Sequence, residues 1–166
     1  MDDDEFFMRQ ALAEAQKSLK KEEVPVGAVL VLKDKVVSRG HNEPIARNDP
    51  TAHAEISALR KAGFKLGNYR LPACDLYVTV EPCAMCLGAL VQARVRRLIF
   101  GAHDPKSGAV ESIMKFPLER MNHRLEIVGG VLATECGKIL RDFFEKKRRS
   151  KKRILKANRT STGRKE

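Results

Sequence analysis

Two short segments of the sequence carry side chains that bind metals or move protons. One reads PTAHAEISALR and contains His53 and Glu55, while the other reads PCAMC and contains Cys83 and Cys86. Cysteines three residues apart in the first turn of a helix can point the same way, and a helix N-terminus favours their thiolate form. With a neutral imidazole they form the Cys₂His donor set that zinc favours, which leaves a fourth position for water.

Glu55 is the candidate proton carrier for such a site. Zinc bound by two thiolates and a neutral imidazole has no net charge left to acidify water strongly, so a nearby carboxylate must act as general base. Glu55 follows His53 by two residues, which on an ideal helix is roughly 200° around the axis. We expect the long glutamate side chain, at the start of its helix, to reach past the metal toward the water. The sequence thus predicts one zinc ion per chain.

Each piece of this pattern has a simpler explanation when it stands alone. A single His-x-Glu is usually a solvated helix face. A Cys-x-x-Cys pair is redox-active or holds a structural zinc about as often as it serves an enzyme site. A structural zinc needs a fourth protein ligand, and none of the candidates has motif spacing to the pair: Cys74, His41, His103 and Cys136. The combination of the two segments is therefore what indicates catalysis.

The elements that must position these residues alternate between helical and strand patterns. We expect a helix over residues 6–19, a hairpin over 26–40, and a helix that begins with Asp49 as cap and Pro50 as first residue. Beyond it we expect a strand over 75–80, a helix over 84–94, a strand over 96–102, a strand near 124–128 and a closing helix over 136–149. This alternation favours an α/β sheet covered on both faces. Both motif segments precede helices at the strand-to-helix turns where open α/β sheets bind ligands.

Length and composition limit the class of protein. The chain has 166 residues, which suits one domain, and 43% of them are hydrophobic. No apolar run approaches the roughly eighteen residues of a membrane span, and the N-terminal MDDDEFF lacks the features of a signal peptide. We therefore expect a cytoplasmic protein with no membrane partner, whose four cysteines stay reduced.

The net charge of +11 is concentrated at the C-terminus. Residues 146–166 hold 11 of the 32 Lys and Arg residues and one of the 21 acidic residues, which leaves residues 1–145 close to neutral. We expect a domain over residues 1–145 and a basic extension over 146–166, helical at first and disordered from Ala157 onward. Clustered Lys and Arg bind nucleic-acid phosphates, and such an extension is hard to explain for an enzyme that acts on small molecules.

The order His-x-Glu followed by Pro-Cys-x-x-Cys is the signature of zinc-dependent nucleobase deaminases. The surrounding segments narrow the choice, because with them residues 5–145 resemble the bacterial tRNA-specific adenosine deaminases of the cytidine-deaminase-like superfamily. The segments that carry the resemblance are VPVGAVLV (24–31), HNEPIARNDPTAHAEI (41–56), NYRL (68–71), LYVTVEPCAMC (76–86), FGAHDPKSGA (100–109) and MNHRLEI (121–127).

The resemblance implies a fold, an assembly and a reaction. The fold is a three-layer α/β/α sandwich around a five-stranded mixed sheet, and the assembly is a homodimer with one zinc per subunit. The reaction is hydrolysis of the wobble adenosine in a tRNA anticodon stem-loop to inosine. His53, Cys83 and Cys86 match the family's zinc ligands. Zinc-bound hydroxide would attack the adenine ring while Glu55 shuttles protons to the ring nitrogen and the departing ammonia.

The resemblance also implies roles in substrate binding. Asn42 matches the family's base-contacting asparagine, and its side-chain amide offers a donor and an acceptor to a purine edge. A turn residue after the second strand is the alternative interpretation of Asn42. Ala54 matches a residue whose backbone meets the base, and Asp104 a position beside the substrate backbone. Better-known members have an arginine just before that aspartate, where this chain has His103.

Three other functions fit parts of the pattern. A deaminase of free bases or nucleosides, such as guanine, cytosine or cytidine, would use the same site without a basic extension. A deaminase domain of riboflavin synthesis is normally joined to a reductase domain that a chain of 166 residues is too short to include. A zinc-stabilised RNA-binding module would hold the metal without catalysis. Ammonia release from a panel of substrates distinguishes the three.

Overall fold

A mixed β-sheet forms the centre of the fold. The computed structural model describes residues 3–162 of the chain. The strands are β1 (Gly27–Leu32), β2 (Lys35–His41), β3 (Cys74–Val80), β4 (Arg97–Ala102) and β5 (Glu126–Gly129). They lie side by side in the order β2-β1-β3-β4-β5. Strand β1 is antiparallel to both of its neighbours, while β3, β4 and β5 are parallel to one another. The expected mixed sheet is confirmed.

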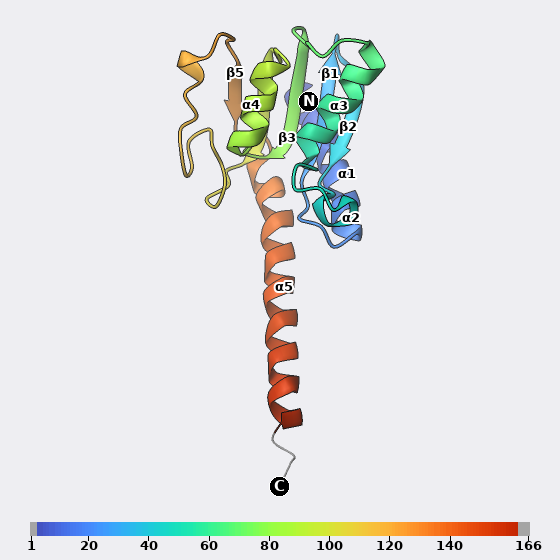
Figure 1. Cartoon of the computed structure of the whole chain (residues 1–166), viewed down its shortest axis with the longest axis vertical. Helices are drawn as coiled ribbons and strands as arrows, with labels where there is room; N and C mark the ends of the chain where they lie inside the picture. The colour runs from blue at the N-terminus through green and yellow to red at the C-terminus, as the bar shows by residue number, and fades with distance from the viewer. Residues whose placement is uncertain (1–2, 163–166) are drawn as a thin grey trace.

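Helices cover both faces of this sheet (Figure 1). On one face lie α3 (Ala54–Leu66) and α4 (Ala84–Gln92), and on the other lie α1 (Asp3–Lys20) and the first turns of α5 (Ala133–Thr162). Alternate strand residues face opposite sides. The core under α3 and α4 includes Leu30, Leu76 and Leu98, whereas the core under α1 and α5 includes their chain neighbours Val29, Tyr77 and Ile99. This is the expected three-layer α/β/α sandwich.

Strand β3, which leads into Cys83 and Cys86, is buried on both faces. Every residue of β3 is buried, as expected for a central strand covered by helices above and below. The hairpin between β1 and β2 turns through Lys33 and Asp34, whose φ angles of 49° and 57° are those of a two-residue type I′ turn. The site residues lie at the other end of the sheet, where β3 runs into α4.

The structure corrects the expected start of the second long helix. The prediction began this helix at Asp49 and Pro50, whereas α3 begins at Ala54. The Asp49 side chain instead accepts hydrogen bonds from the Thr51 N–H at 2.8 Å and from the Thr51 hydroxyl at 2.7 Å. Such local bonds compete with helix formation, so residues 49–51 form a turn. A short helix before it, α2 (Pro44–Arg47), and the 3₁₀ helix η1 (Leu118–Arg120) were not predicted.

The closing helix is longer than the sequence pattern indicates. We expected the closing helix over residues 136–149 to continue into the first part of the basic extension and to give way to disorder at Ala157, but α5 continues to Thr162 and projects from the body (Figure 1). The remaining four residues of the predicted disordered stretch lie outside the described part of the chain. Residues 146–156 are rich in Lys and Arg, which are good helix formers, and extending an existing helix costs far less than starting one. Within residues 3–162, none of the helices combines the length and apolar character needed to cross a membrane.

Candidate active site

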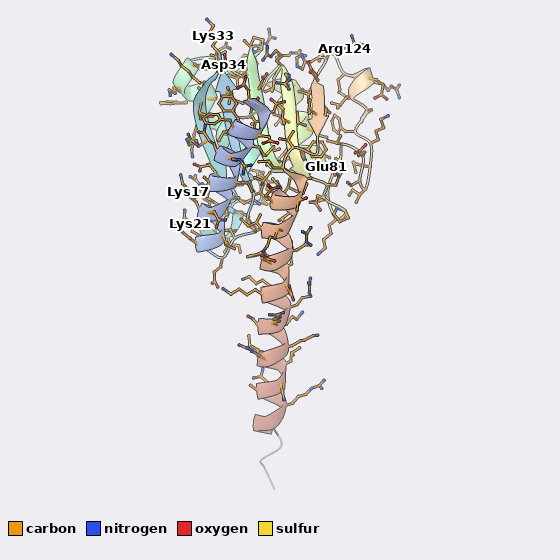
Figure 2. The ribbon with its side chains drawn as sticks, turned by 180° about the vertical axis from the view of Figure 1, so that it is seen from behind. Lys17, Lys21, Lys33, Asp34, Glu81 and Arg124 are labelled. Carbon is orange, nitrogen blue, oxygen red and sulfur yellow. The ribbon has the colours of Figure 1, made fainter. Side chains whose placement is uncertain are left out.

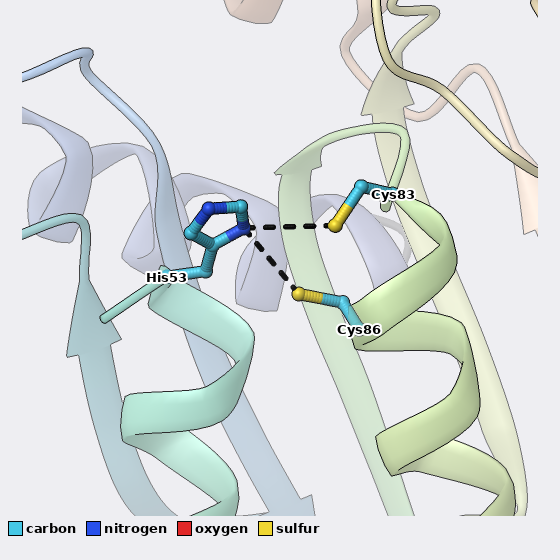
Figure 3. A group of neighbouring side chains, drawn as sticks. All are labelled: His53, Cys83 and Cys86. Atoms are coloured by element: carbon cyan, nitrogen blue, oxygen red, sulfur yellow. Dashed lines mark hydrogen bonds between the residues drawn. The ribbon is translucent and has the colours of Figure 1, made fainter. Parts of the chain in front are cut away.

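Three predicted metal ligands meet at one point between α3 and α4 (Figure 3). The Nδ1 atom of His53 lies 3.7 Å from the Cys83 sulfur and 3.6 Å from the Cys86 sulfur. Zinc bonded to nitrogen at about 2.0–2.1 Å and to sulfur at about 2.3 Å, with tetrahedral angles, places these donor atoms about 3.6 Å apart. The side chains are therefore spaced as a shared zinc ion requires.

Two helix starts create this convergence. His53 is the N-cap residue of α3 and Cys83 that of α4, and neither side chain caps its own helix with a hydrogen bond. Because His53 has an extended backbone outside the helix, the roughly 200° separation of His53 and Glu55 on an ideal helix does not apply. Gly40 lets α3 lie close to β2, since a Cβ at Gly40 would overlap the backbone of α3. The positive ends of both helices thus face the cluster.

The two cysteines differ in how readily they ionise. A hydrogen bond from the Cys86 thiol lowers the pKa of Cys83 to about 4, against the opposing effect of burial, and a bond with His53 adds to the lowering. The same contact with Cys83, together with burial, raises the pKa of Cys86. The contact with Cys83 also raises the pKa of His53. The cluster therefore presents at least one sulfur in the thiolate form that binds metals.

Glu55 lies beside this cluster in the first turn of α3. It is buried, with 4% of its surface exposed, and burial raises the pKa of its carboxyl to about 7. A carboxyl group that titrates near neutrality can both accept and return a proton. Its position and acidity suit the proton transfer that the sequence predicts for it.

A cavity of about 290 Å³ opens over these residues. Its lining includes five of the predicted site residues: Asn42, His53, Glu55, Cys83 and Asp104. The other two, Ala54 and Cys86, are fully buried. None of the suggested fourth protein ligands lines this cavity: Cys74, His41, His103 and Cys136. The arrangement therefore has the form of an open metal site with a carboxyl group and room for a small planar ring.

The orientation of Asn42 is set by the start of α3. Its side-chain Oδ1 accepts a hydrogen bond from the Ala54 N–H at 2.9 Å. This contact uses the side-chain oxygen of Asn42 as an acceptor. The side-chain N–H₂ is then the group with which Asn42 can donate a hydrogen bond to a base. The sequence predicts both residues as base contacts, and the structure shows them bonded to each other.

The loop after β4 holds Asp104 and His103 differently from one another. The Asp104 carboxylate accepts hydrogen bonds from the N–H of Lys106 at 2.9 Å and from the hydroxyl of Ser107 at 2.6 Å, which folds the loop tightly. His103 pairs with Glu111 and packs edge-on against Phe100. Asp104 thus lines the cavity, whereas His103 turns toward its own loop partner.

Several residues of the cavity were not predicted from the sequence. They are Glu81 at the end of β3, Lys106 and Ser107 in the loop after β4, and Leu140 and Phe144 on α5. One signal was present for Glu81, which is a charged residue between an apolar strand and the Pro-Cys motif. The contribution of α5 has no comparable signal, because it depends on how that helix returns across the end of the sheet.

Comparison with known proteins decides the family. Residues 1–148 match the family model described as MafB19-like deaminase. The tRNA-specific adenosine deaminase of Bacillus subtilis (strain 168) is 45% identical over 157 residues, which cover 94% of this chain and 98% of that protein. The chain belongs to the tRNA-specific adenosine deaminase family. It is accordingly a deaminase, a hydrolase that acts on carbon–nitrogen bonds.

Two further matches agree with this family. The tRNA-specific adenosine deaminase of Haemophilus influenzae is 50% identical over 151 residues, which cover 90% of this chain and 87% of that protein. A solved structure from a study of A-to-I editing by tRNA:A34 deaminases at the wobble position of transfer RNA has a TM-score of 0.77 and 47% identity. That match covers 81% of this chain and 99% of the solved chain. Similarity in sequence and fold thus extends over most of the chain.

Proposed function

We propose that this protein deaminates adenosine to inosine at the wobble position of a tRNA anticodon stem-loop. The observation that carries the proposal is the pairing, in one cavity, of a zinc-spaced donor set with a buried carboxyl group that titrates near neutrality. The family supplies the substrate, since its members are named for tRNA-specific adenosine deamination. A tRNA substrate also makes the cytoplasm the expected location.

We assign one zinc ion per chain to His53, Cys83 and Cys86. When bound, zinc supplies a Lewis acid that helps to activate water. Glu55 takes a proton from the attacking water and passes it to the purine ring nitrogen. It then assists proton transfer to the departing amine. A C6–O bond forms, the C6–N bond breaks, and ammonia leaves. Burial of Glu55 supports this role, because it keeps the carboxyl group able to carry a proton at neutral pH.

Asn42 is the proposed base contact, and Ala54, which the sequence predicts as a second one, acts by holding Asn42 in place. The side-chain N–H₂ of Asn42 is oriented by the Ala54 N–H, so it can donate to an acceptor on the purine. Because Ala54 is fully buried at the start of α3, it fixes this geometry from behind. Asp104, which also lines the cavity, is the proposed contact beside the substrate backbone.

The surroundings of the cavity favour RNA over a free base. A second cavity of about 470 Å³ adjoins the first and shares Asp104, Lys106, Leu140 and Phe144 with it. Its lining adds Arg141 and Arg148 from α5. A free base fills only one cavity, whereas a strand that inserts one base must also place its neighbouring nucleotides and phosphates. Cationic side chains beside the catalytic cavity suit that requirement.

We also propose that two copies of the chain form a homodimer through α3 and α4. Phe64 is 93% exposed and Tyr69 is 72% exposed, and both line a groove of about 750 Å³ between these helices. Aromatic side chains exposed on this scale are typical of a protein interface. Light scattering should give the mass of a dimer for the wild type and a lower mass for Phe64→Glu.

The substrate is tested by measuring inosine and ammonia with purified, zinc-loaded protein. The panel comprises an anticodon stem-loop with adenosine at the wobble position, the same stem-loop with adenosine one position later, free adenosine, cytidine and guanine. We expect rapid turnover only of the first RNA. Comparable turnover of a free base or nucleoside would identify a small-molecule deaminase instead. No ammonia from any substrate would favour a zinc-stabilised RNA-binding module.

A further inference from the structure

The loop of residues 103–112 forms one wall of the catalytic cavity. It follows β4 and has no helix or strand of its own, yet it presents Asp104, Lys106 and Ser107 to the cavity. A loop can hold side chains in fixed positions only where its backbone groups have partners. In this loop, several backbone N–H groups donate to the two carboxylate oxygens of a single side chain, Glu81.

Glu81 accepts hydrogen bonds from both ends of this loop. Its Oε1 accepts from the N–H groups of Val110, Glu111 and Ser112 at 3.0, 2.8 and 3.1 Å. Its Oε2 accepts from the Asp104 N–H at 3.0 Å and from the Ser112 hydroxyl. Glu81 is buried, with 2% of its surface exposed. Both carboxylate oxygens are therefore committed to the loop.

The partners of Glu81 are those of an anion-binding loop. They are four backbone N–H groups and one hydroxyl rather than the side chain of a Lys or an Arg. Converging N–H dipoles compensate a buried negative charge in the way that backbone nests bind anions. A neutral side chain of the same shape would offer these N–H groups one acceptor oxygen and one competing donor.

Glu81 also joins this wall to the metal-binding segment. It directly precedes Pro82 and the first cysteine of the motif. The Ala109 N–H donates to the Pro82 carbonyl at 2.9 Å, and the Glu81 N–H donates to the Ala102 carbonyl at 2.8 Å. Gly108 lies so close that a Cβ there would overlap the Glu81 carboxylate. Figure 2 shows Glu81 at the end of the sheet where α5 begins.

We infer that Glu81 is a positioning residue that fixes the loop of residues 103–112 as the substrate wall of the active site. The inference rests on the proposed function, because it assumes that Asp104 and its neighbours contact RNA beside the target base. Glu81 has no free oxygen with which to exchange a proton, so it acts through the loop. Its removal should loosen one wall of the cavity and leave the ligands His53, Cys83 and Cys86 in place.

Two variants test the inference from opposite sides of the contact. Glu81→Gln removes the charge, whereas Gly108→Ala keeps the carboxylate and displaces it by adding a Cβ. In either variant the amides of Asp104, Val110, Glu111 and Ser112 should exchange hydrogen faster, while zinc content stays at one per chain. We expect KM for the stem-loop RNA to rise about tenfold with kcat within about threefold, the pattern of lost substrate binding. Because both changes act on the same contact, the KM of the double variant should be no higher than the higher of the two single-variant KM values.

Glu23→Gln is the matched control. Glu23 is similarly buried, at 1% exposed, and its Oε1 accepts from the Ala46 N–H at 2.8 Å, but within residues 3–162 its side chain forms no hydrogen bond with the loop of residues 103–112. This control should leave exchange in the loop of residues 103–112 unchanged. Where Glu81→Gln folds poorly, Gly108→Ala supplies the same test with the charge retained.

The results distinguish a role of Glu81 in the loop from a role in the metal-binding segment. Unchanged loop exchange in Glu81→Gln overturns the inference, and so does faster exchange with an unchanged KM. Loss of zinc would mean that Glu81 supports the metal-binding segment instead of the loop. Hydrogen exchange needs no substrate, so it reports on Glu81 even if the wild type fails to deaminate the stem-loop. That failure would reject the proposed function alone.

Discussion

The body of the protein and the distal half of α5 hold their side chains in opposite ways. In the body, side chains such as Leu90 and Phe100 are almost fully buried, and the catalytic cavity takes residues from several elements. From Glu145 to Arg159, every side chain of α5 is exposed, and the helix projects away from the sheet (Figure 1). Packing fixes positions in the body, whereas distal side chains are held by contacts along the helix surface, such as the hydrogen bond from Arg149 to Glu145 at 2.7 Å.

This difference separates two kinds of function. Chemistry at a purine ring needs individual atoms held to within a fraction of an ångström, and the packed body provides that. Attraction to RNA phosphates depends mainly on how many cations are close to the strand, and an exposed helix provides that. We therefore expect single substitutions to abolish the function of the body, whereas several together are needed to change that of the distal helix.

The largest expected effect is the loss of a metal ligand. Cys86→Ala removes one of the three donors, so the protein should lose its zinc and all measurable deamination. Elemental analysis and the inosine assay measure both. Cys74→Ala is the matched control, because Cys74 is also buried, at 1% exposed, but lies at the start of β3. Full zinc in Cys86→Ala, or zinc loss in Cys74→Ala, would contradict the assigned ligand set.

The second-largest expected effect is the loss of deamination when the proposed proton carrier, Glu55, is replaced. Glu55→Gln keeps the size of the side chain but cannot exchange protons, so deamination should fall about 10²–10⁴-fold or more, with zinc retained. Single-turnover kinetics with saturating stem-loop RNA measures the chemical step. Asp75→Asn, a buried carboxylate at the far end of β3, should leave the rate unchanged. A rate for Glu55→Gln within about tenfold of wild type would reject the role, since acid–base catalysis is worth more than that.

Two leucines test the contrast in packing directly. Leu90 on α4 is fully buried, and Leu155 on distal α5 is 53% exposed. Leu90→Ala should lower the free energy of unfolding of zinc-saturated protein by about 2–5 kcal/mol. Leu155→Ala should change it by less than about 0.5 kcal/mol. Urea denaturation gives both values. A loss for Leu155→Ala comparable to that for Leu90→Ala would mean that distal α5 packs against another surface in solution.

The smallest effect on chemistry should follow from neutralising the distal helix. Replacing the basic residues from Lys151 to Arg159 with glutamine should weaken RNA binding but spare deamination at saturating RNA. Each phosphate contact that is lost should reduce the slope of log affinity against log salt by about 0.7–0.9. A variant that exchanges Lys and Arg at the same positions keeps the charge and should keep the slope. An unchanged slope after neutralisation would move RNA binding to the body, near Asn42 and Asp104.

The group of possible metal ligands, His53, Cys83 and Cys86, could be predicted because its information is local. The Cys83–Cys86 spacing and the His53–Glu55 spacing are short-range patterns with known chemistry. The strands followed from equally local apolar runs such as residues 75–80. The start of α3 was wrong because the Asp49 side chain bonds to Thr51 in place of capping a helix, and propensity alone does not show which of these two local structures wins.

The hydrogen-bond partners of Glu81 and the helical state of the last residues of α5 could not be predicted, for other reasons. The partners of Glu81 are backbone amides more than twenty residues away, and any sequence supplies such amides. The helical state of residues 157–162 depends on propagation from the good helix formers before them, against the lower helix propensity of Asn, Ser and Thr. The proposed domain boundary after Glu145 remains a prediction based on charge, because the helix runs through it without a break.

The place of α5 in the chain has a consequence for protein synthesis. Leu140 and Phe144 complete the lining of the catalytic cavity, and they lie in the last element of the fold. Domains fold from the N-terminus as they leave the ribosome, so His53, Cys83 and Cys86 emerge well before the cavity can close. A nascent chain can therefore bring together His53, Cys83 and Cys86 before Leu140 and Phe144 are in place to line the cavity.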